Sequence, residues 1–123
     1  MNRFNGADYI AQCGAKASYQ EDAKKLIKDN INYYKNNAKC LLNSFKKMNF
    51  KVWGGVDAPY LWVKTKDNKT SWEMFDIFLK DLDIIIIPGI VFGKGGDGYF
   101  RVSSLGKYED ILIAIDRMEK YFK

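Results

Sequence analysis

Hydrophobic spacing divides the chain into a helical first part and a mixed second part. Residues 7–17 predict a short helix of small side chains with little bulk to bury. Residues 19–48 predict a long amphipathic helix, with apolar positions every three or four residues and lysines on the opposite side. Ser18 and Glu21 have the spacing of a capping box at its start. A helix of this length is typical of a spine that links two bodies.

The second part alternates between strand and helix patterns. Strand patterns cover residues 50–53, 60–65, 84–87 and 99–103, and the run of isoleucines at 84–87 predicts a fully buried strand. Helix patterns cover 71–81 and 107–122, and Thr70 and Glu73 form a second capping-box pattern. The predicted fold class is therefore α+β, with a helical segment over 1–48 and a small domain of one sheet and two helices over 49–123.

Composition excludes several kinds of chemistry. The chain has 123 residues, 47% of them hydrophobic, which is enough to bury a core. It has no histidine, so histidine-activated nucleophiles and histidine-containing metal sites are excluded. Cys13 and Cys40 have no metal-binding or disulfide-framework spacing. We therefore predict no metal site, no membrane partner and a cytoplasmic location, because no apolar run reaches membrane-spanning length and no export signal precedes the first helix.

The formal net charge of +5 is concentrated in the long helix. Residues 16–51 hold nine lysines and three acidic residues. We interpret these lysines first as a solvated helix face and second as a site for a polyanion. Because 17 of the 20 basic residues are lysine, and nucleic-acid binders favour arginine, we predict no nucleic-acid partner. A non-catalytic interaction module that uses the lysine-rich helix on an anionic partner stays as the alternative function.

Arg101 is the sharpest candidate for a binding residue. It lies between Phe100 and Val102 in an apolar strand and shares a face with Tyr99 and Ser103. Burying an unpaired guanidinium is costly, so a carboxylate or phosphate gripped by two parallel hydrogen bonds would explain it. Two alternatives remain open: an internal salt bridge to an acidic residue, or an edge strand on which Arg101 faces water.

The glycine-rich segment at 93–98 matches G-x-G-x-x-G through Gly93, Gly95 and Gly98. A strand follows it, whereas a dinucleotide site requires a helix there, and the further motifs of a kinase are missing. The segment therefore predicts a flexible loop shaped for close approach. No nucleophile and base are paired in the sequence, so we predict no catalytic residue, no cofactor-binding residue and no complete catalytic site in this chain.

Six motifs, in order, resemble one family. They are RFNGA at 3–7, YYKNN at 33–37, GGVDAPYLWV at 54–63, SWEMF at 71–75, PGIVFG at 88–93 and GYFRVS at 98–103. Together they are similar to the C-terminal part of LL-diaminopimelate aminotransferases, which are fold type I, pyridoxal-phosphate-dependent enzymes. The resemblance covers nearly the whole chain. It implies a long N-terminal helical arm followed by the small α/β domain of that fold.

The resemblance also implies a function and two site residues. Members of the family are homodimers that transfer an amino group between an amino acid, LL-diaminopimelate, and a 2-oxo acid, 2-oxoglutarate, in lysine biosynthesis. The arginine at the position of Arg101 binds the α-carboxylate of the substrate. The asparagine at the position of Asn5 reaches into the active site of the neighbouring subunit. The small domain closes over the substrate.

The departures from the family pattern limit what this chain can do by itself. The Schiff-base lysine of the family and most of its pyridoxal-phosphate ligands lie upstream of the Asn5 motif. The resemblance therefore implies pyridoxal 5'-phosphate in the complete enzyme and none for this chain alone. It implies a fragment that is inactive without an N-terminal large domain. Ile90 and Val91 also replace the serine and glycine expected after Pro-Gly, which adds bulk beside the substrate pocket.

Overall fold

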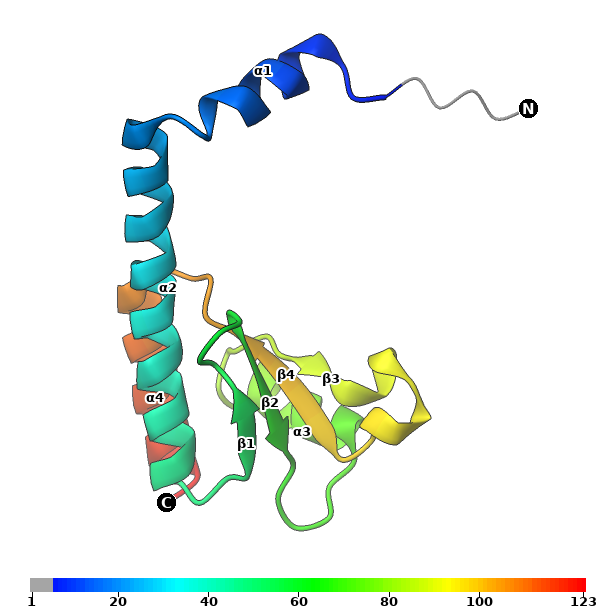
Figure 1. The fold of residues 1–123 in the computed structure, drawn as a ribbon. Helices are drawn as coiled ribbons and strands as arrows, with labels where there is room; N and C mark the ends of the chain where they lie inside the picture. The colour runs from blue at the N-terminus through cyan, green and yellow to red at the C-terminus, as the bar shows by residue number, and fades with distance from the viewer. Residues whose placement is uncertain (1–5) are drawn as a thin grey trace, which may run out of the picture. The chain divides into compact units, whose positions relative to one another are not determined.

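The chain consists of two units that meet within one long helix. A computed structural model describes residues 6–123 (Figure 1). The boundary between the two units lies between Tyr33 and Tyr34. The first unit holds helix α1 (Tyr9–Ala17) and the first part of helix α2 (Glu21–Lys47). The division falls inside α2, whereas the predicted domains meet at residue 48, and those limits stay a prediction. No helix among residues 6–123 is both long and apolar enough to cross a membrane.

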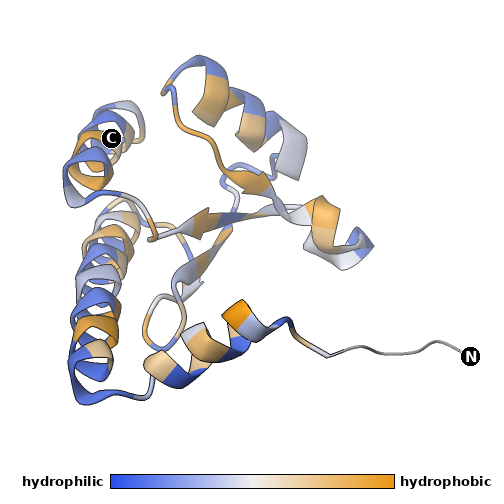
Figure 2. Cartoon of the chain, turned by 90° about the horizontal axis from the view of Figure 1, so that it is seen from above, coloured by the Kyte–Doolittle hydropathy of each residue, from blue (hydrophilic) through white to orange (hydrophobic). Residues whose placement is uncertain are grey.

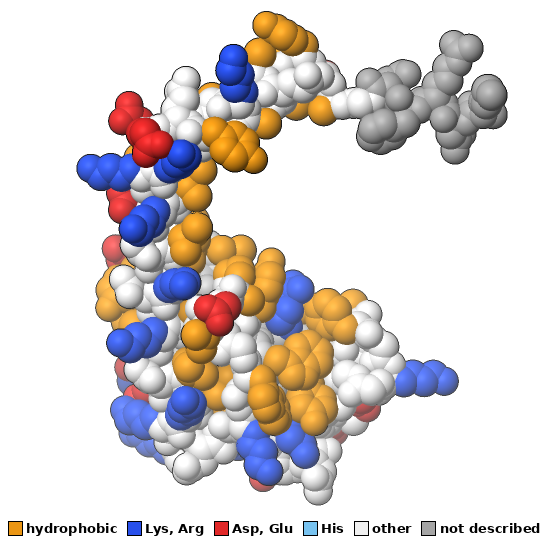
Figure 3. All heavy atoms as spheres, viewed as in Figure 1, with side chains coloured by type: hydrophobic (Ala, Val, Ile, Leu, Met, Phe, Trp, Pro, Cys, Tyr) orange, Lys and Arg blue, Asp and Glu red, His pale blue; other side chains and the backbone are white. Residues whose placement is uncertain are grey.

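The first unit buries little of its apolar surface. Figure 2 shows hydrophobic and hydrophilic positions mixed along α1 and α2. No residue of α1 is buried, and Ile10 is 82% exposed. Hydrophobic side chains lie uncovered along α1 in Figure 3. In the first part of α2, Leu26 is 66% exposed and Ile31 is also exposed. The short helix is therefore confirmed, and its apolar side chains stay exposed within the described chain.

The predicted capping box at the start of α2 is wrong. The Ser18 hydroxyl donates a hydrogen bond to the Ala15 carbonyl oxygen at 2.6 Å, and the Ser18 backbone N–H donates to Gly14. Ser18 therefore ends α1 and does not begin α2. Glu21 instead forms an exposed ion pair with Lys24 at 2.8 Å. The motif has the spacing of a capping box, but Ser18 is already hydrogen-bonded to the last turn of α1.

The second unit is built on one antiparallel sheet with strand order β1-β2-β4-β3. The strands are β1 (Val52–Gly54), β2 (Tyr60–Lys64), β3 (Ile87–Pro88) and β4 (Tyr99–Ser103). The helices are α3 (Ser71–Lys80) and α4 (Tyr108–Tyr121), with 3-10 turns η1 (Gly89–Phe92) and η2 (Lys94–Gly96) before β4. This arrangement confirms the predicted α+β class.

The prediction of a fully buried strand at 84–87 is wrong. Only Ile87 of that run belongs to a strand, and β3 is a two-residue edge strand. Ile86 is buried, but Ile85 is 79% exposed. An edge strand also accommodates Pro88, which has no N–H to donate to a further neighbour. The isoleucine run thus crosses from core to surface and does not lie inside the sheet.

One face of the sheet carries the core. Leu61, Val63 and Phe100 point into it and are completely buried. Phe100 packs against Phe45 of α2 and Phe78 of α3, with ring centroids 6.0 and 5.1 Å apart. Tilted and edge-to-face ring pairs of this kind add to the free energy gained by burial alone. Helices α2, α3 and α4 therefore cover the same face, to which α4 contributes buried Ile111 and Met118.

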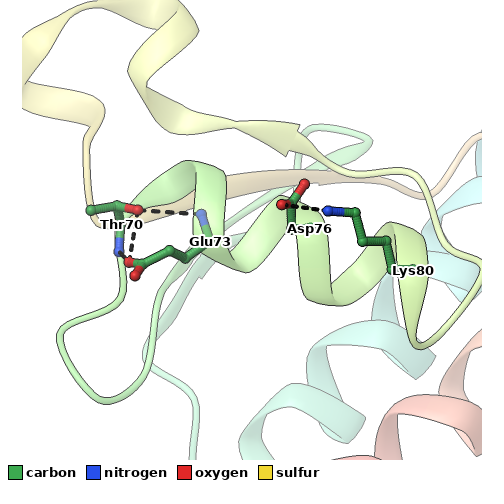
Figure 4. A network of polar contacts seen from close by, with 4 residues as sticks. All are labelled: Thr70, Glu73, Asp76 and Lys80. Atoms are coloured by element: carbon green, nitrogen blue, oxygen red, sulfur yellow. Dashed lines mark hydrogen bonds and ion pairs between the residues drawn. The ribbon is translucent and has the colours of Figure 1, made fainter.

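Helix α3 begins with the capping box that the sequence predicts (Figure 4). The Glu73 N–H donates to Thr70 Oγ1 at 3.2 Å, and the Thr70 N–H donates to Glu73 Oε2 at 2.7 Å. The Thr70 hydroxyl also donates to Glu73 Oε2, at 2.8 Å. The two hydrogen bonds that Thr70 donates to this carboxylate, the one from its backbone N–H first, hold the pKa of the Glu73 carboxyl below its usual value. Further along α3, Lys80 and Asp76 form an ion pair at 2.8 Å.

We expect Thr70→Ala to lower the free energy of unfolding by about 1 kcal/mol at neutral pH, because the first turn of α3 loses its cap. The matched control is Lys80→Ala, which breaks the exposed ion pair of the same helix and should change stability by less than about 0.5 kcal/mol. Urea titration of the 123-residue chain measures both. Equal effects of the two substitutions would contradict the cap.

The contribution of the Glu73 carboxylate should also depend on pH. Since its pKa is lowered in the folded chain, the stabilisation is present at neutral pH and is lost as pH falls below roughly 4. The difference between Thr70→Ala and the unsubstituted chain should therefore shrink in acid. A difference that grows in acid would have the wrong sign.

Candidate carboxylate-binding site

Strand β4 places Arg101 on the face of the sheet opposite the core. Phe100 is buried beneath the helices, so its neighbour Arg101 must point the other way. The strand lies inside the sheet, where Arg101 pairs with Trp62 of β2 and Ile87 of β3. The alternative in which Arg101 lies on an edge strand is therefore wrong, because β1 and β3 form the edges.

The Arg101 guanidinium contacts two aromatic rings. Its Cζ atom lies 4.4 Å from the ring centroid of Tyr60 and 5.0 Å from that of Phe92. The side chain is half-buried, yet within residues 6–123 it forms no ion pair. The alternative of an internal salt bridge is therefore wrong for the described part of the chain. A guanidinium that contacts only ring faces has its N–H donors available to bind an anion.

Further aromatic side chains surround this position. Trp62 stacks on Tyr99 with centroids 5.7 Å apart and planes at 16°, and it meets Phe92 edge-on at 5.7 Å. Trp53 extends the group from β1, 6.0 Å from Tyr99. Both Trp53 and Phe92 are about half exposed, at 50% and 54%. Figure 3 shows hydrophobic side chains gathered over the strands with basic side chains beside them. Arg101 thus lies in an open aromatic surface.

The glycine-rich segment makes the close approach predicted for it, but through Gly89 and Gly96, which do not occupy the glycine positions of the motif. The backbones of Gly89 and Gly96 touch, so that a Cβ on Gly96 would overlap the Gly89 carbonyl group. A Cβ on Gly89 would lie 2.7 Å from the Tyr99 carbonyl oxygen. Within the motif, Gly93 and Gly98 have φ of +122° and +75°, a region that favours glycine, while Gly95 has open space around it.

Helix α3 fixes the end of this segment just before β4. Asp97 Oδ1 accepts hydrogen bonds from the Ser71 N–H at 2.9 Å and the Gly98 N–H at 3.0 Å. These backbone hydrogen bonds lower the pKa of the Asp97 carboxyl. The buried Ser71 hydroxyl lies 2.9 Å from the Tyr99 carbonyl oxygen, its acceptor. The start of the strand that carries Arg101 is therefore attached to the first turn of α3.

A second polar network fixes the other end of β4. Asn37 Nδ2 donates to the carbonyl oxygens of Ser104 and Gly106 at 3.0 and 2.9 Å. The Ser104 N–H and hydroxyl both donate to the Pro59 carbonyl oxygen, at 2.8 and 3.1 Å. Asn37 and Ser104 are completely buried. Sequence reasoning identified Asn37 only as part of a motif, because its partners lie 67 or more residues away.

The structure gives partial information on the other predicted residues. Asn5 lies outside the described residues. Ile90 and Val91 lie in η1, next to Phe92, and Val91 is exposed. Their effect on a substrate pocket stays a prediction. Among residues 6–123, no cluster of three or more His, Cys, Asp or Glu side chains is arranged to hold a metal ion.

Comparisons with known proteins find LL-diaminopimelate aminotransferases and other aminotransferases, although no family model matches the chain. An LL-diaminopimelate aminotransferase from Agathobacter rectalis is 44% identical over 117 residues, which is 95% of this chain and 29% of that protein. One from Methanosphaera stadtmanae is 43% identical over 118 residues, again 29% of its length. The chain thus spans less than a third of the curated relatives that it matches.

Solved structures show the same relationship. The L,L-diaminopimelate aminotransferase from Chlamydomonas reinhardtii matches 98% of this chain and 29% of its own, with a TM-score of 0.92 and 39% identity. An aromatic aminotransferase from Pyrococcus horikoshii matches 87% of this chain with a TM-score of 0.80 and 29% identity. The predicted fold, the small domain of fold type I aminotransferases with its helical arm, is confirmed. Over the span that it matches, the chain is similar in sequence and in fold to LL-diaminopimelate aminotransferases.

Proposed function

We propose that this chain is the C-terminal, substrate-binding part of a pyridoxal-phosphate aminotransferase that acts on LL-diaminopimelate, and that Arg101 binds the α-carboxylate of the substrate. The observation that carries the proposal is the half-buried guanidinium on the open face of an interior strand, which pairs with no carboxylate among residues 6–123. The family relationship supports the same role. The alternative of a lysine-rich interaction module has no comparable support.

The geometry suits an anchor for a carboxylate. A guanidinium can donate two parallel N–H···O hydrogen bonds to a carboxylate, which fixes the orientation of the ligand as well as its position. Because β4 is attached at both ends, the guanidinium is presented from a rigid strand. Aromatic side chains around it exclude part of the water that would compete for its donors. Arg101 would thereby orient the substrate for a reaction carried out by other groups.

The described residues do not fit a pyridoxal-phosphate site. A lysine that forms a Schiff base must be kept uncharged by its surroundings, usually through burial. None of the 17 lysines is buried. In fold type I enzymes this cofactor supplies electron withdrawal from the bound amino acid. We infer that its ligands belong to the part of the relatives' length that this chain does not span, and we assign no step through it to this chain.

The exposed apolar side chains of the first unit support the proposal that further protein covers it. Exposed apolar side chains on α1 and the first part of α2, among them Tyr9, Ile10 and Leu26, leave a surface that water solvates poorly. The large domain, a second subunit, or both would cover these side chains in a homodimeric enzyme. Asn5, which precedes α1 in the sequence, would reach a neighbouring active site in that assembly.

We expect Arg101→Ala to lower kcat/KM roughly 100-fold, because a charged hydrogen-bonded contact worth about 3 kcal/mol is lost. The assay uses this chain in place of the matching segment of the Agathobacter rectalis relative, with LL-diaminopimelate and 2-oxoglutarate as substrates. Arg117→Ala is the matched control, since Arg117 lies on α4 and bonds to the Leu82 carbonyl oxygen. Unchanged kinetics for Arg101→Ala in a folded, active chimaera would remove Arg101 from the site.

We also expect the 123-residue chain to show no preferred lysine for pyridoxal 5'-phosphate. After incubation and borohydride reduction, peptide mass spectrometry should find low, scattered labelling of exposed lysines. Lys64→Arg serves as the control, because Lys64 pairs with Tyr99 in the sheet and its removal should leave the labelling of the other lysines unchanged. Stoichiometric labelling of one lysine would contradict the assignment of the cofactor to the rest of the enzyme.

A further inference from the structure

The two rings that contact Arg101 come from opposite sides of β4, one from β2 and one from the turn η1 that follows β3. Tyr60 lies on β2 opposite Ser103, so it is the diagonal neighbour of Arg101 on the same face. Phe92 comes from η1, directly after the edge strand β3, whose Ile87 pairs with Arg101. The guanidinium is thus approached from both sides of its own strand.

Contact with ring faces is suited to holding an arginine that must bind something else. Attraction between a cation and a ring acts through the flat face of the ring, while the N–H groups of guanidinium point outward in its own plane. Tyr60 and Phe92 can therefore restrain the group without accepting its hydrogen bonds. A free arginine side chain has many rotamers and loses conformational entropy when one of them is fixed. Restraint before binding reduces that loss at the moment of binding.

The position of Phe92 depends on the backbone contact between Gly89 and Gly96. That contact brings η1 against η2 and leaves no space for a side chain at either glycine. The Trp62 ring closes the third side, 3.0 Å from where a Cβ on Gly89 would lie, and meets the Phe92 ring edge-on. Phe92 is half exposed, but the turn that carries it is packed against η2 through the contact between Gly89 and Gly96.

We propose that Tyr60 and Phe92 are positioning residues that hold the Arg101 guanidinium by their ring faces, with its N–H donors unengaged, so that the anion site is formed before its ligand arrives. The role in carboxylate binding rests on the proposed function. The holding of Arg101 does not, because it is a property of the free chain. The contact between Phe92 and Arg101 also differs from the packing of a core ring, since half of the Phe92 surface remains exposed.

The first test observes Arg101 in the free 123-residue chain by NMR of the arginine Nε–Hε groups. The Hε proton of Arg101, assigned by its loss in Arg101→Lys, should be shielded relative to that of Arg117. Phe92→Leu and Tyr60→Leu should each move it toward the value of free arginine, and the conservative Phe92→Tyr and Tyr60→Phe should not. An Arg101 Hε at the free-arginine position, or one that neither leucine variant moves, overturns the inference.

The second test measures binding, with L-glutamate as the probe, by titration of the same resonance. Phe92→Leu should raise the apparent Kd roughly two- to fivefold, and Phe92→Tyr should restore it. Ring-dependent shielding with no saturable response to glutamate would contradict the proposed function while supporting the holding of Arg101. Unchanged affinity in both leucine variants, in a chain that binds glutamate, would overturn the positioning role.

The glycine contact provides an independent arm. Gly96→Ala must displace η1 and with it Phe92, so the Arg101 Hε should lose shielding and the chain should lose stability. Gly95→Ala is the matched control, because nothing lies within 4 Å of the added Cβ. Equal spectra for the two variants would contradict the link between the glycines and Arg101. If Gly96→Ala fails to fold, Phe92→Leu still decides the inference.

Discussion

The burial of Phe100 is the constraint on which the rest of the structure depends. Its ring is completely enclosed between α2, α3 and Phe50, which fixes the register of β4 against its neighbours. Successive residues of a strand face opposite sides, so a slip of one residue would exchange Phe100 for Arg101 in the core. A guanidinium there would meet no carboxylate, because no Asp or Glu among residues 6–123 is buried. The core therefore determines which way Arg101 points, because burying Phe100 on one face of β4 places Arg101 on the other face.

Polar contacts between distant segments then convert that orientation into a precise position. Ser71 and Asp97 attach the start of β4 to α3, while Asn37 attaches the residues after it to α2. Buried polar groups in proteins are nearly always hydrogen-bonded, and breaking such a contact costs more than forming it contributes. Both networks use side-chain groups that reach backbone atoms. They can therefore fix the path of the strand without restricting which side chains line the open face.

The sequence predicts what depends on local order and misses what depends on contacts between distant residues. Helical periodicity predicts α2, α3 and α4, and the Thr70–Glu73 cap is correct because both partners lie in one turn. Strand alternation also predicts the face of Arg101. The failures have two causes. Ser18 lies between two helices, and its hydroxyl bonds back to Ala15 at the end of α1, so the choice between two local caps decides its role. The isoleucines at 84–87 have a pattern that fits two structures, and tertiary packing decides between them. The approach of Tyr60 and Phe92 to Arg101 depends on register and on paired glycines, which no local pattern encodes.

The two units differ in where their stability comes from. A helix of nine residues such as α1 is marginal in water by itself, and α1 buries no residue within the described chain. The second unit has a continuous core of aromatic and aliphatic side chains around Phe100. All of the residues that hold Arg101, from Asn37 to Ser104, lie in that second unit. The geometry around Arg101 therefore depends on the part of the chain that packs upon itself.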